Sequence, residues 1–495
     1  MKKIKLLTTP YKFYNQFMPP VALCLISQKL LDNGIEHDKD DLYVKLHYAQ
    51  KNGSINLDIP DSEISMWENY IRGEDIKEVE ETVAKIAGLT NFEDYGILLF
   101  SSRYPPLAEI PNHILPLALF RYLKRKYNPL IIINNMESRG KYMGLVDEIM
   151  PGSNELFYYL REKLGFDLKS NLKIGTKQNL DGLPLELYRY QGITVAGYYF
   201  YDGCPYNCYF CDGFFTQKRN SIPRRISLPD PKKVVQEIKE FAGKYGIRNF
   251  MFHNTNINAT EKFAREIASN IIDFNLDIMW CDSATFKGMT TELLDLLKEA
   301  GCIKLVFGFE TASKRLQKRI NKVIDLAHVE KIIRHCYDIG IWVDLTLLCG
   351  LPYETYEDIY ETLLFIRKNY RYIRGLNLNR FVLRPSEFLF NDIKHGIIIK
   401  KVVNDSWTIG FDEIHGMKWE EKWEYMNKVY SDFINAVDPV KVDFIRPVHH
   451  IFRVFSNKVT VSNINRYLDT KVLNNDTTKL DLLIKKYEEI KIEQL

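Results

Sequence analysis

The sequence predicts an α/β protein built on two sheets, and two observations carry this prediction. Short apolar strands alternate with helical patterns along most of the 495 residues, which is typical of parallel sheets covered by helices. Six such units follow one another between about residues 193 and 385, too few for a closed eight-stranded barrel. We therefore expect a doubly wound, Rossmann-like N-terminal domain, a partial (β/α)6, TIM-like barrel, and a mixed α+β C-terminal region.

Changes in this pattern predict the domain borders. We expect the first domain over residues 1–165, a polar linker over 166–190, the partial barrel over 191–385, and a C-terminal substrate or capping region over 386–495. In the first domain, apolar runs predict strands at 3–9, 95–101 and 130–133, and apolar periodicity predicts helices at 20–31 and 115–126.

The barrel strands are expected at 193–200, 247–253, 278–284, 304–310, 342–349 and 376–383. Asp230-Pro231 opens one intervening helix as an N-cap followed by a first-turn proline. Gly246, Gly301 and Gly340 close three others, because glycine accepts the left-handed conformation that ends a helix. Beyond the barrel, helical segments are expected near 418–436 and from 478 onward.

Composition excludes several classes. The 67 basic and 64 acidic residues nearly cancel, so charge alone implies no nucleic-acid partner. No apolar run is long enough for a signal peptide or a spanning segment, so we expect a cytoplasmic protein without a membrane partner. Eight cysteines are too few for a disulfide scaffold. The acidic run of Asp38, Asp40 and Asp41 is expected to be solvated at the start of a strand.

Three of the eight cysteines, Cys204, Cys208 and Cys211, lie in the segment YDGCPYNCYFCDGFF with the spacing C-x3-C-x2-C. The segment follows the first barrel strand and so lies at the carboxyl end, where such barrels hold their active sites. Three thiolates can bind three irons of a 4Fe–4S cluster and leave the fourth iron open. The alternative, a structural zinc site, needs a fourth ligand, which His253 or Cys281 could supply only through the fold.

This segment resembles the radical S-adenosylmethionine superfamily. The resemblance implies a 4Fe–4S cluster held by Cys204, Cys208 and Cys211, whose open iron chelates S-adenosylmethionine. It further implies reductive cleavage to a 5′-deoxyadenosyl radical, sensitivity to oxygen, and a reductant such as flavodoxin or ferredoxin. Phe210 matches the family position near the adenine.

Further segments between residues 193 and 385 resemble the same superfamily. The stretch FHNTNIN follows the second strand, where the family binds the methionyl end of the cofactor, although the usual Gly-Gly-Glu is absent. The resemblance therefore suggests Asn254 and Asn256 as cofactor-binding residues. Glu310, in Gly-Phe-Glu, matches a carboxylate that contacts the cofactor, with a structural carboxylate as the alternative. The turn GLPYET over 350–355 resembles the family's Gly-Leu-Pro-Gly-Glu-Thr.

Near the N-terminus, Met18-Pro19-Pro20 with its following helix, and the stretches VDEI at 146–149 and GSNEL at 152–156, resemble cobalamin-binding domains fused to radical enzymes. The motif Asp-x-His-x-x-Gly, whose histidine coordinates cobalt in many such domains, is missing. The sequence therefore leaves open whether this domain binds cobalamin or supports the barrel without it.

Cys349 indicates which reaction follows. It ends the fifth barrel strand, where its weak S–H bond could donate hydrogen to a substrate radical, and the alternative is a buried packing cysteine. Cys281 is the second candidate for the hydrogen donor. The overall pattern, a cobalamin-like domain without its histidine followed by a barrel with Cys211-Asp212-Gly213, resembles enzymes that modify ribosomal peptides, and with Cys349 it favours Cα epimerisation of a peptide. The alternatives are a cobalamin-dependent radical C-methyltransferase acting on a peptide or small molecule, and a non-enzymatic Fe–S structural or sensor protein. Methylthiolation of transfer RNA is disfavoured, because Cys24 is the only cysteine before Cys204.

Overall fold

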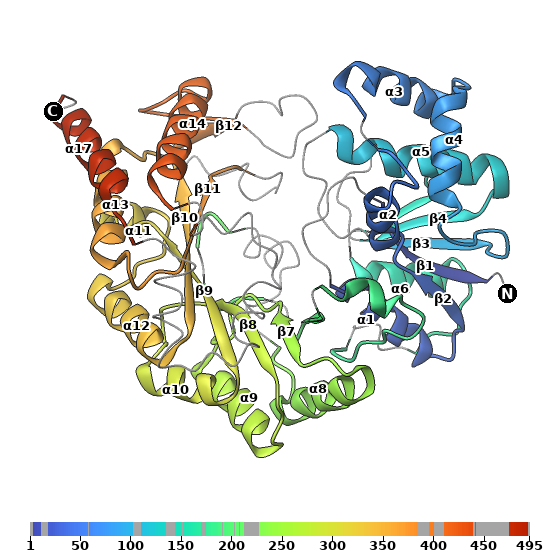
Figure 1. Cartoon of the computed structure of the whole chain (residues 1–495), viewed down its shortest axis with the longest axis horizontal. Helices are drawn as coiled ribbons and strands as arrows, with labels where there is room; N and C mark the ends of the chain where they lie inside the picture. Colours follow the sequence, from blue (N-terminus) through green and yellow to red (C-terminus); the bar gives the residue numbers. More distant parts are fainter. Residues whose placement is uncertain are drawn as a thin grey trace. The chain divides into compact units, whose positions relative to one another are not determined.

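A computed structural model (Figure 1) describes residues 3–10, 18–57, 59–101, 110–134, 144–150, 152–169, 175–190, 192–201, 203–206, 208–211, 227–383, 396–399, 410–438, 441 and 475–493. The chain divides into two compact units, Met1–Tyr198 with Glu240–Ile247, and Tyr199–Lys239 with Arg248–Leu495. Within these described ranges, no helix combines the length and apolar character needed to cross a bilayer.

The first unit contains a five-stranded parallel sheet in the order β2-β1-β3-β4-β5. Its elements are β1 (Ile4–Thr8), α1 (Val21–Leu31), β2 (His37–Asp40), α2 (Leu42–Lys51), α3 (Ile64–Arg72), α4 (Lys77–Ala87), β3 (Ile97–Ser101), α5 (Ile110–Tyr127), β4 (Leu130–Asn134), β5 (Glu148–Met150), α6 (Ser153–Glu162) and, at its end, β6 (Val195–Tyr198), with short 3₁₀ turns at Asp61–Glu63 and Leu185–Tyr188.

The chain order of the first sheet reverses between β1 and β3, which makes this point the switch of a doubly wound sheet. Strands β1 and β3 are mainly apolar and buried along their whole length, as expected where helices cover both faces. Phe100 of β3 packs edge-to-face against Phe120 of α5, with ring centroids 4.9 Å apart. The core of this unit therefore lies between the sheet and its helices.

The second sheet has the order β11-β10-β9-β8-β7-β6. Its further strands are β7 (Asn249–Phe252), β8 (Met279–Ala284), β9 (Cys302–Glu310), β10 (Trp342–Cys349) and β11 (Gly375–Arg380). The helices are α8 (Pro231–Tyr245), α9 (Glu261–Asp273), α10 (Thr291–Glu299), α11 (Lys314–Arg319), α12 (Leu326–Ile339), α13 (Tyr356–Asn369), α14 (Trp419–Ala436) and α17 (Thr478–Glu493), and β12 (Ile397–Ile399) pairs with β13 (Phe411–Glu413) as an antiparallel hairpin.

Buried polar contacts hold the strands of the second sheet in place. Trp280 of β8 is fully buried and donates its indole N–H to the carbonyl of Ala300, 2.7 Å away. The buried carboxylate of Asp344 on β10 forms an ion pair with Lys304 of β9 at 2.5 Å. A side chain at Gly375 of β11 would lie 2.1 Å from the Asp344 carboxylate, so only glycine fits beside this ion pair.

The predicted fold class is confirmed, since the first sheet and strands β7 to β11 of the second are parallel, and the second sheet forms a partial barrel. The predicted β10 over 342–349 matches residue for residue, whereas α5 begins at Ile110, before the expected 115. The acidic run, expected at the start of a strand, instead makes up most of the short strand β2, whose sequence is HDKD.

The expectation that the acidic run is solvated is wrong for Asp40 and Asp41, which are buried. Asp41 accepts hydrogen bonds from the Thr8 hydroxyl at 2.6 Å and the Tyr188 hydroxyl at 2.8 Å. It also caps α2 through the Val44 N–H at 3.2 Å. These donors replace water around the carboxylate.

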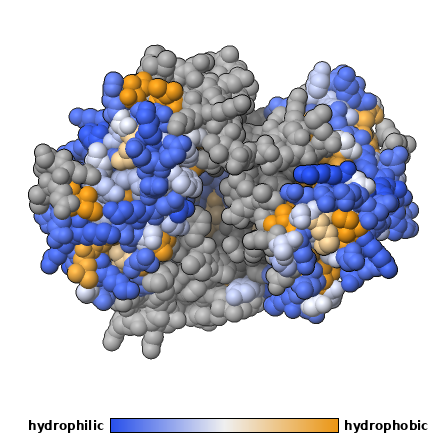
Figure 2. Space-filling view, turned by 90° about the horizontal axis from the view of Figure 1, so that it is seen from above, coloured by the Kyte–Doolittle hydropathy of each residue, from blue (hydrophilic) through white to orange (hydrophobic). Residues whose placement is uncertain are grey.

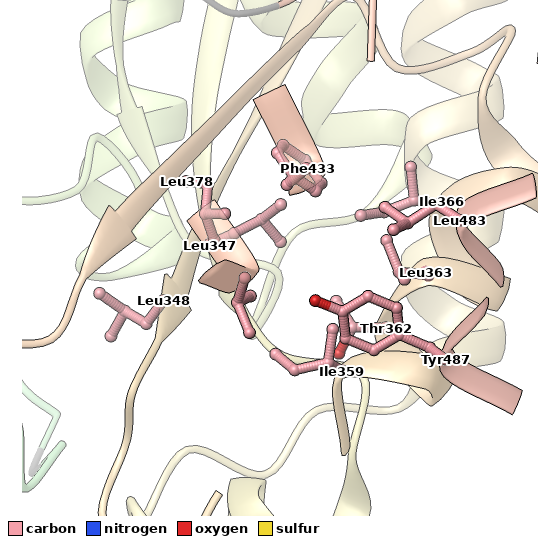
Figure 3. Close-up of a pocket in the computed structure, with 11 residues that line it drawn as sticks. Leu347, Leu348, Ile359, Thr362, Leu363, Ile366, Leu378, Phe433, Leu483 and Tyr487 are labelled. Atoms are coloured by element: carbon pink, nitrogen blue, oxygen red, sulfur yellow. The ribbon is translucent and has the colours of Figure 1, made fainter. Parts of the chain in front are cut away.

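Hydrophilic side chains dominate the described surface in the view of Figure 2, with apolar residues scattered among them. Exposed large apolar side chains include Leu482 of α17, which is 62% exposed. Its neighbour Leu483 is only 7% exposed and lines a cavity of about 20 Å³ between the sheet and the helices α13, α14 and α17, walled mainly by apolar side chains (Figure 3).

We expect Leu483→Ala to lower the free energy of unfolding by about 2–5 kcal/mol, because it enlarges a cavity that is already present. The matched variant Leu482→Ala, one residue earlier on the same helix, should change it by less than about 0.5 kcal/mol. Denaturant unfolding of the metal-free chain measures both. Equal losses in the two variants would show that α17 does not pack through Leu483.

Candidate active site

The cysteine loop follows β6, and the structure describes its residues 203–206 and 208–211, so Asp212 and Gly213 lie outside the described residues. Cys204, Cys208 and Cys211 are all partly exposed. The carbonyl of Cys208 accepts the N–H of Cys211 at 3.2 Å, which closes a tight turn. Tyr209 donates its N–H to the carbonyl of Ile320 at 3.0 Å. The loop is therefore anchored to the segment that ends α11.

Burial raises the pKa of the Cys208 thiol to about 11 and also raises the pKa of Cys204. Iron binding needs thiolates, so it must displace these protons. No group of three or more Cys, His, Asp or Glu side chains in the described part of the chain is placed to hold a single metal ion. A 4Fe–4S cluster does not require ligands that converge on one metal ion, because each thiolate binds a different iron.

The two asparagines after β7 differ in what they contact. Asn256 is partly exposed and its side-chain amide donates to the sulfur of Cys204 at 3.3 Å, so it lies beside the predicted cluster. Asn254 is buried, accepts the N–H of Phe200 at 3.2 Å, and donates its amide to the carboxylate of Asp282 at 2.7 Å. The polar atoms of the Asn254 side chain are thus used inside the protein, which favours a supporting role.

Glu310 lies at the end of β9 with a left-handed φ of 65° and is 6% exposed. Its carboxylate forms an ion pair at 2.7 Å with Lys322, which follows α11. A β-carbon at Gly308 would lie 2.4 Å from the Lys322 ammonium, so the glycine makes room for the pair. Sequence reasoning missed Lys322, and the small residue two positions before Glu310 was the available signal.

An apolar pocket of about 40 Å³ adjoins the cysteine loop. Its wall contains Tyr209, Phe210, Arg319, Ile320, Leu351, Pro352, Phe381, Leu383 and Ile397. Phe210, predicted to lie near the adenine, is therefore on the wall of a pocket that could receive an apolar face of a ring.

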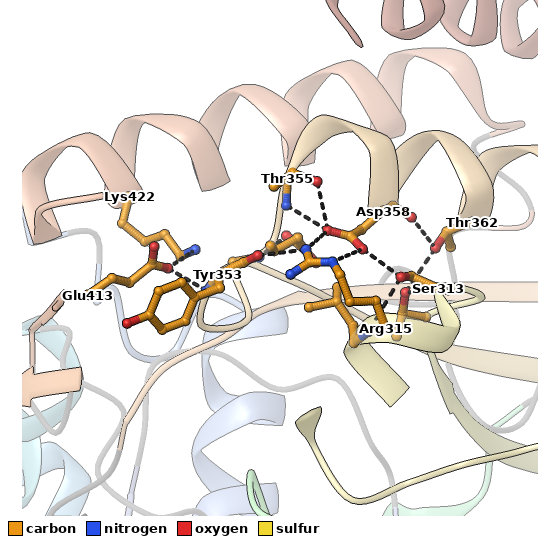
Figure 4. A network of polar contacts seen from close by, with 12 residues as sticks. Ser313, Arg315, Tyr353, Thr355, Asp358, Thr362, Glu413 and Lys422 are labelled. Atoms are coloured by element: carbon orange, nitrogen blue, oxygen red, sulfur yellow. Dashed lines mark hydrogen bonds and ion pairs between the residues drawn. The ribbon is translucent and has the colours of Figure 1, made fainter. Parts of the chain in front are cut away.

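The turn over 350–355 is held by a polar network that Figure 4 shows. Tyr353 stands where the resembling family has glycine, and it adopts a left-handed φ of 64°. Its N–H donates to Glu413 at 2.6 Å, and its hydroxyl donates to the carbonyl of Gly396 at 2.6 Å. The guanidinium of Arg319 lies over its ring, 3.9 Å from the centroid. These contacts compensate for the unfavourable backbone conformation.

The same network anchors the turn to neighbouring helices. Asp358 of α13 accepts the Thr355 N–H at 2.8 Å and pairs with Arg315 of α11. Glu413 and Lys422 form a buried ion pair at 2.6 Å. The turn also opens the helix α13 through a capping box formed by Thr355 and Asp358.

Cys349 ends β10 as predicted, but its thiol is fully buried against α14. Its sulfur lies 4.0 Å from the carbonyl of Met426, and burial raises its pKa. A β-carbon at the next residue, Gly350, would collide with Met426. This environment favours the packing role over hydrogen donation. Cys281, the runner-up, is also buried, on β8.

In the first unit, two buried polar atoms lie at the carboxyl edge of the sheet near its switch point. The Thr9 hydroxyl follows β1 and the Asn134 side-chain carbonyl ends β4, and neither has a hydrogen-bond partner among the described residues. Buried polar atoms are normally paired, and doubly wound sheets bind ligands at this edge. This edge therefore fits a polar ligand such as a cobalamin, while the cysteine loop fits a cluster.

Comparison with sequence families gives a match of residues 198–366 to the Radical SAM superfamily. An uncharacterized methyltransferase of Pyrococcus horikoshii is 26% identical over 238 residues, which are 45% of this chain and 50% of the relative. Cytidylyl-2-hydroxyethylphosphonate methyltransferase of Streptomyces wedmorensis is 29% identical over 164 residues, 32% of this chain and 29% of the relative. Anaerobic magnesium-protoporphyrin IX monomethyl ester cyclase of Rubrivivax gelatinosus is 26% identical over 162 residues, which are 32% of this chain and 28% of the relative. The matches thus span half or less of these relatives.

Two solved structures share the fold. The radical S-adenosylmethionine methyltransferase TsrM from Kitasatospora setae, with cobalamin and a [4Fe-4S] cluster bound, has a TM-score of 0.57 at 12% identity and covers 99% of this chain and 100% of that chain. The cobalamin-dependent S-adenosylmethionine radical enzyme OxsB has a TM-score of 0.55 at 11% identity, and the match covers 100% of this chain and 79% of that chain. At these identities the likeness concerns the fold.

We expect Asn254→Ala to lower the free energy of unfolding by about 1–3 kcal/mol, because it removes the side-chain acceptor of the buried Phe200 N–H and the amide donor to one carboxylate oxygen of Asp282. Asn256→Ala should cost less than about 1 kcal/mol, since Asn256 is partly exposed. Chemical denaturation of the iron-free protein measures both. A larger loss in the Asn256 variant would contradict the supporting role of Asn254.

The buried carboxyl of Asp282 should make stability depend on pH. Burial raises its pKa from 3.8 to about 8. The native state then binds more protons than the unfolded state between these values, so the stabilising contribution is complete below about pH 4 and is lost as the pH rises towards 8. Asp282→Asn, which cannot ionise, should show a smaller fall of the unfolding free energy over this range. An unchanged pH profile would show that Asp282 is ionised in the folded protein.

Proposed function

We propose that this chain, whose residues 198–366 form a radical SAM domain, is a cobalamin-dependent radical methyltransferase. The observation that carries the proposal is the fold likeness along nearly the whole chain to TsrM and OxsB, whose structures hold cobalamin. Two of the relatives above are named as methyltransferases, which supports the same reaction. Of the functions that the sequence suggests, methyl transfer is thereby favoured over peptide epimerisation.

The residues proposed to bind the cofactors lie in both units. Cys204, Cys208 and Cys211 would hold the 4Fe–4S cluster, and Asn256 donates a hydrogen bond to the Cys204 sulfur. Glu310, fixed by Lys322, offers a carboxylate to S-adenosylmethionine, and Phe210 offers an apolar wall. Thr9 and Asn134 would contact cobalamin at the edge of the first sheet. When bound, these cofactors supply an electron for cleavage of S-adenosylmethionine and a carrier for its methyl group.

A radical SAM enzyme needs a substrate and a reductant. For the methyl acceptor we favour a small organic molecule over a peptide. One relative is named for a cytidylyl phosphonate, and TsrM has also been solved with tryptophan as substrate. Cys349, on which the epimerisation hypothesis rests, is buried against α14, which supports a packing role over hydrogen donation.

The test is anaerobic reconstitution of the full chain with iron, sulfide and hydroxocobalamin, followed by desalting and absorbance spectroscopy. We expect retained cobalamin near one equivalent, and S-adenosylhomocysteine as a product of S-adenosylmethionine under reductant, because methyl transfer leaves this thioether. Asn134→Leu should lower cobalamin retention by about tenfold, the loss of one good polar contact, with an unchanged iron content.

The matched control is Cys204→Ala, which should lose iron but retain cobalamin. Formation of 5′-deoxyadenosine alone, with no cobalamin retained and no S-adenosylhomocysteine, would refute methyl transfer and return epimerisation or another cobalamin-free radical reaction to first place.

A further inference from the structure

We propose that Lys322 is the counter-charge of the iron–sulfur cluster: its ammonium faces the cysteine loop and raises the reduction potential at which the cluster accepts an electron. The inference uses the cluster of the radical SAM domain and is independent of what the radical does next. It assigns a function to a residue that no sequence motif singled out.

The position of Lys322 is fixed by its own segment. Its N–H donates to the carbonyl of Gln317 at 2.8 Å, and Asn321 before it adopts a left-handed φ of 54°, so the chain turns sharply after α11. The adjacent Ile320 carbonyl accepts the N–H of Tyr209, which joins this segment to the cysteine loop. Lys322 is thus tied by backbone bonds to the loop that it faces.

The ammonium itself lies in a confined space. The Lys322 side chain is only 16% exposed, and its nitrogen lies 5.6 Å from the centre of the Phe210 ring, next to Cys211. Gly308 leaves the space in which it meets Glu310, since any β-carbon there would collide with the ammonium. A long cationic side chain is thus held in place close to the predicted ligands.

Charge explains why such a residue is useful. The ammonium of Lys322 pairs with the Glu310 carboxylate at 2.7 Å, so a cation and an anion lie side by side near the cysteine loop. Reduction adds a negative charge to the cluster, and nearby charges set its potential. A cation in a poorly solvated place therefore stabilises the reduced state, and a carboxylate destabilises it.

The experiment is a redox titration of the reconstituted full chain, without S-adenosylmethionine, followed by the electron paramagnetic resonance signal of the reduced cluster. Lys322→Met should shift the midpoint potential to a lower value, because the negative Glu310 is then uncompensated. Glu310→Gln should shift it to a higher value, because the ammonium is then unopposed. Lys322→Arg should stay close to the parent.

The matched control is Lys318→Met, which removes the same charge from an exposed position on α11 and should leave the potential unchanged. Iron content and thermal unfolding of each variant show whether the cluster and the fold are intact. Shifts of Lys322→Met and Glu310→Gln in the same direction would indicate disruption of the site and overturn the proposal, as would unchanged potentials in loaded variants. Should Lys322→Met fail to bind iron, the direction of the Glu310→Gln shift still decides.

These potentials do not depend on cobalamin or on S-adenosylhomocysteine formation. Failure of methyl transfer would therefore leave this result standing, and an unaltered potential would leave methyl transfer standing.

Discussion

In a parallel sheet, the loops that follow the strands all lie at the same edge, and the candidate active site of the second unit depends on this constraint. The cysteine loop, Asn256, Glu310 and the turn after β10 come from segments far apart in the sequence, yet each follows the carboxyl end of a strand. Short contacts then couple them, such as Asn256 with Cys204 and Lys322 with Glu310. The chemistry of the site is thus a consequence of strand direction.

The sequence was informative where hydrophobic pattern and structure coincide. Strand β10 is mainly apolar and ends at a glycine turn, so its limits were predictable. The burial of the acidic run was not, because Asp41 is buried through partners such as Tyr188, which lies 147 residues away in the sequence. Burial of a carboxylate by distant donors leaves no local trace in a sequence.

The site shows the same division. The spacing of the three cysteines identified their loop. Lys322 belongs to no motif, and its place in the site becomes apparent only through its contacts with Gly308 and Glu310 on β9. Asn254 and Asn256 are two residues apart with similar chemistry, but one is buried against Asp282 and the other contacts a thiol. Cys349 was placed correctly on its strand, yet the helix α14, distant in sequence, decides that its thiol is enclosed.

Tyr353 shows how the barrel and the hairpin of β12 and β13 are linked during assembly. A tyrosine in a left-handed backbone conformation needs contacts that offset the strain, and here both hydrogen bonds that do so come from Gly396 and Glu413, at least 43 residues later. The turn can therefore acquire its final shape only after synthesis has passed the hairpin. A ribosome-bound chain that ends soon after β11 would carry this loop in another conformation, so the pocket beside Phe210 is completed late in biogenesis.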